Sequence, residues 1–269
     1  MTVLKRLLAS GLLSLLAPAT ALAQGFAAYV SPPRFEASAT PGKPQRLVLE
    51  IQHVGTQAGS YRFYTNDWTL GADQSVNFTE TLTPGSCRPW VAIERRELTL
   101  NPGSRYRYRF EVTPPADAPV GECRFALMIE GRDPAQVQGP VPLVGGRIGV
   151  IVYVAIGNAA PTLEITGARV QRQGEQLAAI LDVRNSGTAH GRLDGVITGT
   201  DASGRRIDFA PATLPILPQE TRGVALSPMA PEGSPEGTAA PVPVYPVDLK
   251  GNLDYGKQRL PVAIRLIAP

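Results

Sequence analysis

Residues 98–130, LTLNPGSRYRYRFEVTPPADAPVGECRFALMIE, decide the fold. Apolar and charged residues alternate from Arg105 to Val112, which is the two-residue period of a strand with one buried and one solvated face. The turn tripeptide Asn101-Pro102-Gly103 joins this strand to the preceding apolar stretch, so we expect a hairpin. Pro114-Pro115 interrupts the ladder before the apolar run 123–129. Three antiparallel strands joined by short turns would be half of a small β-sandwich.

Short strand patterns recur through the rest of the first half, and no segment has a helical period worth naming. With the opening stretch they give about seven strands, so the predicted fold class is all-β. Pro32-Pro33 breaks the first pattern, which confines it to a sheet edge or to a kink where a strand crosses between sheets. The other expected strands are 46–54, 61–68, 76–78 and 90–93.

The predicted organisation is two immunoglobulin-like β-sandwich domains behind a leader. We expect a signal peptide at 1–23, a first domain at 24–157 and a second β-sandwich domain at 158–269. The short linker Gly157–Pro161 separates the two domains. The strand pattern of the second domain is weaker because glycines interrupt it.

The first residues have the features of an export signal. Lys5 and Arg6 give a positive start, Leu7–Leu16 an apolar core, and Ala21-Leu22-Ala23 a cleavage site, so we predict export to the periplasm with cleavage before Gln24. The apolar core is too short to span a bilayer comfortably, and we expect no membrane insertion. Without Lys5 and Arg6 the chain has 24 basic and 23 acidic residues, which argues against a nucleic-acid partner.

The chain has only two cysteines, Cys87 and Cys123. In an exported chain one even pair is most simply a disulfide, and the C-x-x-C spacing of a reactive thiol pair is absent. Closing this loop would contribute about 3 to 4 kcal/mol on the loop-entropy model.

The stretch 147–156, RIGVIVYVAI, has apolar residues on both faces, whereas a strand in a two-layer sandwich needs only one. Two explanations remain open. The strand could be central and buried between its own sheet and the second domain. Alternatively, it could be an edge strand whose second face serves a partner chain.

Several motifs resemble the periplasmic pilus chaperones of the PapD type. They are Val30-Ser31-Pro32-Pro33-Arg34 in the first strand, a Leu-Thr-Leu-x-Pro-Gly turn, the segment Pro-Pro-Ala-Asp-Ala-Pro-Val-Gly-Glu, and a long loop leading into an apolar last strand. The resemblance covers residues 26–157, and residues 158–269 match only in being a second β-domain.

The resemblance implies a chaperone that lends a strand to a pilus or fimbrial subunit until an outer-membrane usher exchanges it for the next subunit. Main-chain hydrogen bonds would supply the pairing, and alternate side chains would fill pockets in the subunit. The resemblance also leaves open a dimer in which two copies of the chain cap each other's lending strands. The lending strand would lie within 141–154, with donor residues Val141, Leu143, Ile148, Val150 and Val152.

The resemblance also implies an anchor for the terminal carboxylate of the subunit, made by an Arg on the first strand and a Lys on the last. Arg34 matches the Arg, and its guanidinium fork suits a carboxylate. Gly149 or Val150 stands where the Lys would fall, and the nearest basic residue is Arg147. If the Lys position is Gly149, Arg147 lies two residues away on the same strand face and could complete the anchor with Arg34. This departure from the pattern leaves Arg34 open to a second interpretation, as a solvated arginine on an edge strand.

Nothing in the sequence recommends an enzyme, a cofactor or a metal site. His53 and His190 have no acidic or Cys neighbours at ligand spacing, so we expect solvated or turn histidines. We expect Trp68 and Trp90 in the core and Arg105, Arg107 and Arg109 on a wet sheet face. The alternative to a chaperone is a secreted structural or adhesive protein of two immunoglobulin-like domains.

Overall fold

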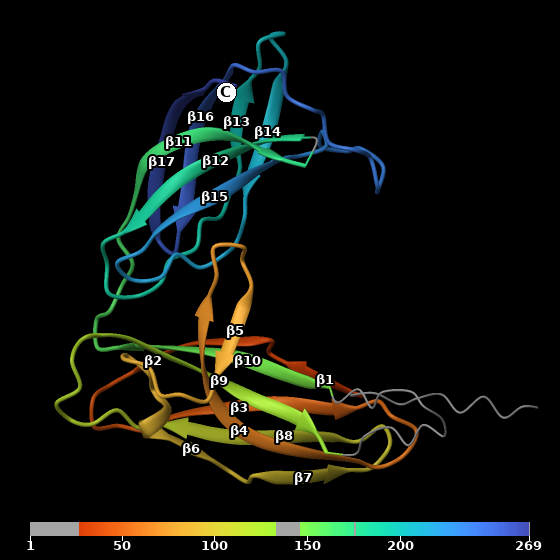
Figure 1. The fold of residues 1–269 in the computed structure, drawn as a ribbon, viewed down its shortest axis with the longest axis vertical. Helices are drawn as coiled ribbons and strands as arrows, with labels where there is room; N and C mark the ends of the chain where they lie inside the picture. Colours follow the sequence, from red (N-terminus) through yellow and green to blue (C-terminus); the bar gives the residue numbers. More distant parts are fainter. Residues whose placement is uncertain (1–26, 133–145, 175, 269) are drawn as a thin grey trace, which may run out of the picture.

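The computed structural model describes residues 27–132, 146–174 and 176–268. Two β-rich domains are stacked along the long axis and joined at residues 157–162 (Figure 1). Apart from the 3-10 turn Arg88–Trp90, the described residues form only strands, turns and loops, so the predicted all-β class is confirmed. No helix in these ranges has the length and apolarity needed to cross a membrane.

The first domain packs two sheets face to face. One sheet has the strand order β1-β3-β8-β6, and the other has the order β2-β10-β9-β4-β5 with β7 paired to β4. The strands are β1 Ala28–Ser31, β2 Arg34–Ala39, β3 Gln45–His53, β4 Gly59–Leu70, β5 Val76–Thr79, β6 Val91–Ile93, β7 Glu97–Leu100, β8 Arg105–Val112, β9 Gly121–Gly131 and β10 Arg147–Ile156.

Pro32-Pro33 lies where the first strand crosses between these sheets. β1 pairs with β3 in one sheet, and β2 pairs with β10 in the other. Proline cannot donate to a ladder, so the break between the two pairings falls at the residues that could not have continued either one. Both interpretations that the sequence allowed hold, because the chain crosses between the sheets here and β1 and β2 are each the edge strand of their sheet.

The hairpin expected at Asn101-Pro102-Gly103 is wrong. The turn is present, but β7 before it pairs with β4, and β8 after it pairs with β3 and β6 in the opposite sheet. Gly103 has a φ of 70°, which suits the turn. The alternation of apolar and polar residues shows that each strand has one buried face. It does not show whether two successive strands pair within one sheet or face each other from two sheets, because the same residues are buried in both arrangements.

Aromatic side chains fill the space between the two sheets. Phe63 and Tyr108 stack with ring centroids 4.1 Å apart, and Phe110 meets Phe125 edge to face at 6.2 Å. Trp68 is buried as expected, in a separate cluster on the outer face of the second sheet, whereas Trp90 is only partly buried against the main core. Arg105, Arg107 and Arg109 are exposed, as predicted for a wet face.

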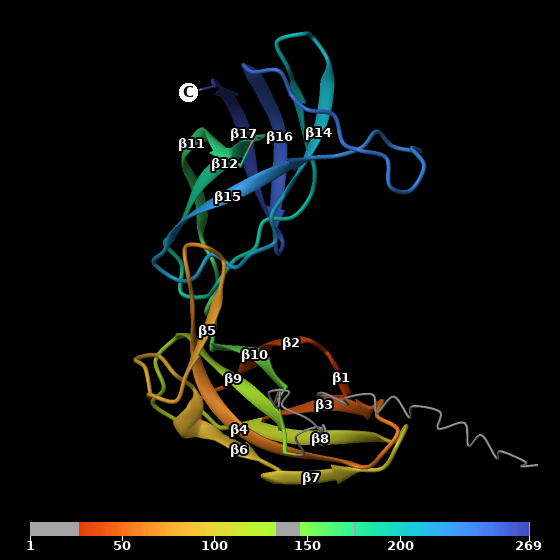
Figure 2. The same ribbon diagram turned by 45° about the vertical axis from the view of Figure 1, so that its right-hand side comes forward.

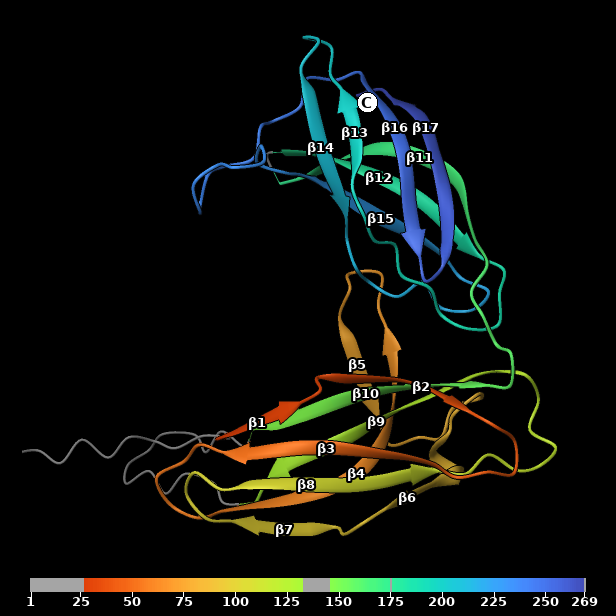
Figure 3. The same ribbon diagram turned by 180° about the vertical axis from the view of Figure 1, so that it is seen from behind.

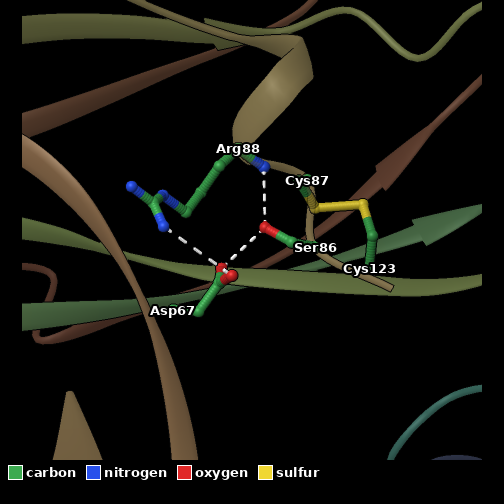
Figure 4. Close-up of a disulfide and its surroundings, with 5 residues drawn as sticks. All are labelled: Asp67, Ser86, Cys87, Arg88 and Cys123. Atoms are coloured by element: carbon green, nitrogen blue, oxygen red, sulfur yellow. Dashed lines mark hydrogen bonds and ion pairs between the residues drawn. A yellow bond between two sulfur atoms is a disulfide. The ribbon is translucent and has the colours of Figure 1, made fainter. Parts of the chain in front are cut away.

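The disulfide Cys87–Cys123 ties the loop after β5 to β9, and both half-cystines are buried (Figure 4). Beside it, the buried carboxylate of Asp67 accepts hydrogen bonds from the Ser86 hydroxyl at 2.6 Å and the Thr83 amide at 2.6 Å, with Arg88 Nη1 3.8 Å away. This polar cluster and the disulfide together fix a loop that has little apolar burial of its own.

The second domain is a single seven-stranded sheet of order β11-β12-β15-β14-β13-β16-β17. The sheet curls until β11 and β17 come together around one core, as Figures 2 and 3 show from two sides. Its strands are β11 Leu163–Gln173, β12 Gln176–Asn185, β13 Ile197–Thr200, β14 Arg206–Pro211, β15 Thr221–Pro228, β16 Val247–Tyr255 and β17 Gln258–Leu266.

Replacing both Cys87 and Cys123 by Ser should lower the free energy of unfolding by about 3 to 4 kcal/mol, because the unfolded chain regains the entropy of the closed loop. Denaturant unfolding of the oxidised protein and the double variant measures the difference. Reducing the wild-type protein should reproduce it, and equal midpoints for the two proteins would contradict this account.

Candidate functional site

β10 has a partner along its whole length on one side and along only part of it on the other. All of Arg147–Ile156 pairs antiparallel with β9, but only Ile151–Ile156 pairs, in parallel, with β2. Within the described residues, Arg147–Val150 therefore has an unpaired edge, which we call the open rim. Every second residue of such an edge presents its N–H and C=O to an incoming strand.

The two apolar faces of β10 have different environments. Val150, Val152 and Val154 are fully buried in the core of the first domain. On the other face, which we call the outer face, Ile151 and Tyr153 lie in a cluster with Trp68 to which Leu217 of the second domain contributes. Over residues 151–156 the second apolar face is thus covered from within the chain, as the first explanation held. Among the residues that the structure describes, no strand pairs with the edge at Arg147–Val150.

The structure separates the predicted donor residues into three groups. Val150 and Val152 have no exposed surface and belong to the core of their own domain. Ile148 lies on the open rim and is partly exposed. Val141 and Leu143 lie outside the described residues.

Arg34 is the first residue of β2 and lies beside Ile151, where the open rim ends. Its Nε donates to Oε1 of Glu36 at 2.8 Å, its side chain is 52% exposed, and its two terminal nitrogens make no hydrogen bond or ion pair within the described residues. Residues paired in a parallel ladder point to the same face, so Arg34 and Ile151 both face outward. A guanidinium thus stands at the end of the unpaired edge.

Arg147 is exposed on the outer face at the far end of the rim, opposite Glu130 and near Tyr64. Burial and the charge of Glu130 raise the pKa of Tyr64, while a hydrogen bond from Arg147 acts in the opposite direction. Arg147 is four residues along β10 from Ile151, about 13 Å at the rise of a strand. The structure does not bring the two arginines together at one point, and Arg147 flanks the rim.

Gly149, one of the two positions at which the family pattern would have a Lys, is covered by an aromatic ring. A Cβ atom there would collide with Cζ of Phe78 and lie 3.1 Å from Sδ of Met128. Phe78 belongs to the hairpin of β4 and β5, which extends from the first domain toward the second (Figure 1). Only glycine leaves room for the ring, so this position holds an aromatic contact and no cation.

The sequence predicted solvated or turn histidines; neither side chain is solvated, although His190 does lie in the loop after β12. His53 is buried, with Nδ1 2.5 Å from the Tyr61 hydroxyl and Nε2 2.6 Å from the carbonyl oxygen of Gln57. The side chain of His190 is also buried, at the junction of the two domains, and its ring stacks on Tyr153 at 3.9 Å. Their partners are distant in sequence or are main-chain atoms, so local spacing gave no signal.

His190 joins the second domain to two carboxylates of the first. Its Nδ1 is 2.5 Å from Oε2 of Glu122, whose side chain is 2% exposed, and its backbone N–H donates to the same oxygen at 3.1 Å. Its Nε2 lies 3.6 Å from Oε1 of Glu36. Buried carboxylates need such partners to offset the loss of hydration. This pairing therefore ties the second domain to β2 and β9 of the first.

Two arginines of the second domain complete the junction. Arg192 Nε donates to Glu36 Oε1 at 3.3 Å, and its Nη2 lies 3.3 Å from the Tyr153 hydroxyl. Arg222, which is 8% exposed, donates to the carbonyl oxygens of Leu70 and Gly71 at 3.4 and 3.3 Å. The second contact holds the tip of the β4–β5 hairpin against the second domain.

Comparisons with solved structures find chaperones. YadV is 10% identical with a TM-score of 0.47, covering 90% of this chain and 100% of YadV. DraB of E. coli is 14% identical with a TM-score of 0.45, covering 90% and 100%. The structure of CsuC–CsuE, a chaperone–tip adhesion subunit complex of Acinetobacter baumannii Csu pili, matches with 13% sequence identity and a TM-score of 0.45. The match covers 91% of this chain and 100% of the matched chain. Each similarity is one of fold.

No family model matches the sequence, and no curated protein matches it significantly.

The junction should loosen in acid through Glu36. Burial raises the pKa of this carboxyl, but the hydrogen bond from Arg34 and the charges of His190 and Arg192 outweigh it, so the pKa lies below its ordinary value of 4.5. The pairing is complete above pH 4.5 and is lost as the pH falls through the lowered pKa. After correction for the intrinsic exchange rate at each pH, the protection of the Thr188 and His190 amides from hydrogen exchange should fall as the pH drops across this window.

The matched control is Glu36→Gln, which keeps the shape of the side chain and removes its titration. The difference between the two pH profiles isolates Glu36 from other groups at the junction. Superimposable profiles for wild type and variant would contradict the role given to this carboxylate.

Proposed function

We propose that the protein is a periplasmic chaperone that binds pilus or fimbrial subunits by strand pairing at the open rim of β10. The observation that carries the proposal is that the unpaired edge at Arg147–Val150 ends beside Arg34. The terminal guanidinium nitrogens of Arg34 have no partner among the described residues. Strand addition to such an edge gives affinity through main-chain hydrogen bonds, and an anchor at the end of the edge fixes the register.

The geometry also favours one direction for the incoming strand. A partner beside Arg147–Val150 would lie in line with β2, which occupies the next positions along the same side of β10. If its terminal carboxylate is to meet Arg34, its last residue must lie at the Val150 end of the rim. The partner strand would therefore run parallel to β10, with Arg34 binding the carboxylate through its terminal nitrogens.

The donor side chains proposed for the subunit are Ile148 together with Val141 and Leu143, the last two from outside the described residues. Val150 and Val152 would instead hold β10 in its own core. Arg147 would flank the partner strand, and Arg34 would be its anchor. The same proposal includes export with cleavage before Gln24, exchange of the subunit at an usher, and a self-capping dimer. It involves no catalysis.

A secreted structural protein of two immunoglobulin-like domains is the second candidate. The covered outer face at Ile151 and Tyr153 favours it, because that half of β10 needs no partner. The two candidates differ at the rim alone, which has a binding role only in the chaperone.

Arg34→Ala should weaken subunit capture by about ten- to a hundredfold, because a charge-assisted hydrogen bond pair contributes roughly 1.5 to 3 kcal/mol. The affinity of Arg34→Lys should lie between those of wild type and Arg34→Ala, since lysine keeps the charge and loses the forked guanidinium. Co-expression with the subunits, recovery from the periplasm and a competition measurement give the ratio. The matched control is Arg46→Ala, another exposed arginine, at 81%, which should bind as wild type. An equal loss of affinity in both variants would contradict the role of Arg34 as the anchor.

Ile148→Glu should abolish capture in a protein that still unfolds cooperatively, because Ile148 is partly exposed at the rim. Val150→Glu should instead destabilise the isolated first domain, since it buries a carboxylate where the valine has no exposed surface. Thermal unfolding and capture are measured on both variants. If Ile148→Glu captures subunits normally, the structural candidate is preferred.

A further inference from the structure

Phe78 covers the open rim on the outer face. Its ring lies directly over Gly149 and beside Met128, and it is partly exposed. Phe78 and Trp68 are paired residues of β5 and β4, and both belong to the apolar cluster that includes Tyr153. An aromatic surface thus borders the unpaired edge at the position next to the end of the rim.

The hairpin that carries Phe78 is held from both sides. Asp67–Leu70 pairs with Val76–Thr79, and the carbonyl oxygens of Leu70 and Gly71 accept hydrogen bonds from the buried Arg222. The ring therefore has a supported position and does not depend on a partner to place it.

Pairing rules decide which side chain of an incoming strand meets this ring. Partner residues in a parallel ladder point to the same face as the residues beside them. Positions beside Arg147 and Gly149 therefore face outward, and positions beside Ile148 and Val150 face inward. Because Arg34 already lies beside Ile151, the last outward position open to a partner is the one beside Gly149.

We propose that Phe78 is a specificity-determining residue of the rim, which selects an apolar side chain at the last outward-facing position of the partner, within its final two residues. The inference rests on the proposed function and deepens it. An apolar side chain there would lose water against the ring, whereas a charged one would lose hydration without gaining a partner. The preceding outward position of the partner lies beside Arg147, which is itself paired with Glu130 of β9. This position suits a polar residue.

The test uses the mature full-length protein and synthetic peptides of alternating apolar and polar residues that end in a free carboxylate. The peptides carry Leu or Lys at the last or the second-last position, and one Leu peptide is amidated at its end. Fluorescence anisotropy gives their affinities for wild type, Phe78→Ala, Phe78→Leu and the control Leu82→Ala. Leu82 is an exposed apolar side chain, at 57%, in the loop after β5.

At one of the two positions, wild type and Leu82→Ala should bind the Leu peptide about tenfold more tightly than the Lys peptide. Phe78→Ala should lose this preference and Phe78→Leu should keep it, with thermal unfolding showing that each variant is folded. A preference that survives Phe78→Ala overturns the inference and leaves carboxylate capture intact. If the amidated peptide binds as well as the free carboxylate, or no peptide binds, the proposed function fails.

Discussion

The ladder between β9 and β10 is the constraint on which the rest of the first domain depends. All ten residues of β10 are paired with β9, so the face to which each side chain points is fixed along the whole strand. The valines at 150, 152 and 154 are thereby committed to the core, and the residues between them to the outer face. The second neighbour, β2, begins only at Arg34, and this offset creates the rim.

The outer face has two uses along the same strand. Toward Ile156 it supports the second domain through apolar contact at Tyr153 and Leu217 and through the carboxylates of Glu36 and Glu122. Toward Arg147 it has an unpaired edge beside a glycine under an aromatic ring. Glu36 connects the two regions, because one of its oxygens is contacted by Arg34 on the rim side and by His190 and Arg192 on the junction side.

The sequence predicted the elements of the first domain better than their partners. Alternation identified β8, and Pro32-Pro33 marked the crossing, because both depend on residues close together in the chain. The false hairpin shows the limit, since a two-residue period reveals a buried face and not which sheet covers it. Arg34 stood out by its motif. Phe78 and His190 did not, because what matters about them is a contact with Gly149 or Glu122 that no local spacing encodes.

The contact of Arg222 with the hairpin tip has a mechanical consequence. A rotation of the second domain about residues 157–162 would displace Leu70 and Gly71, and the paired strands would transmit that displacement to the ring over Gly149. Occupancy of the edge and interdomain angle would then be thermodynamically linked. The factor by which one arrangement of the domains binds a partner more tightly at the edge equals the factor by which a bound partner favours that arrangement. A domain that touches no ligand would in this way tune how firmly the other one holds it.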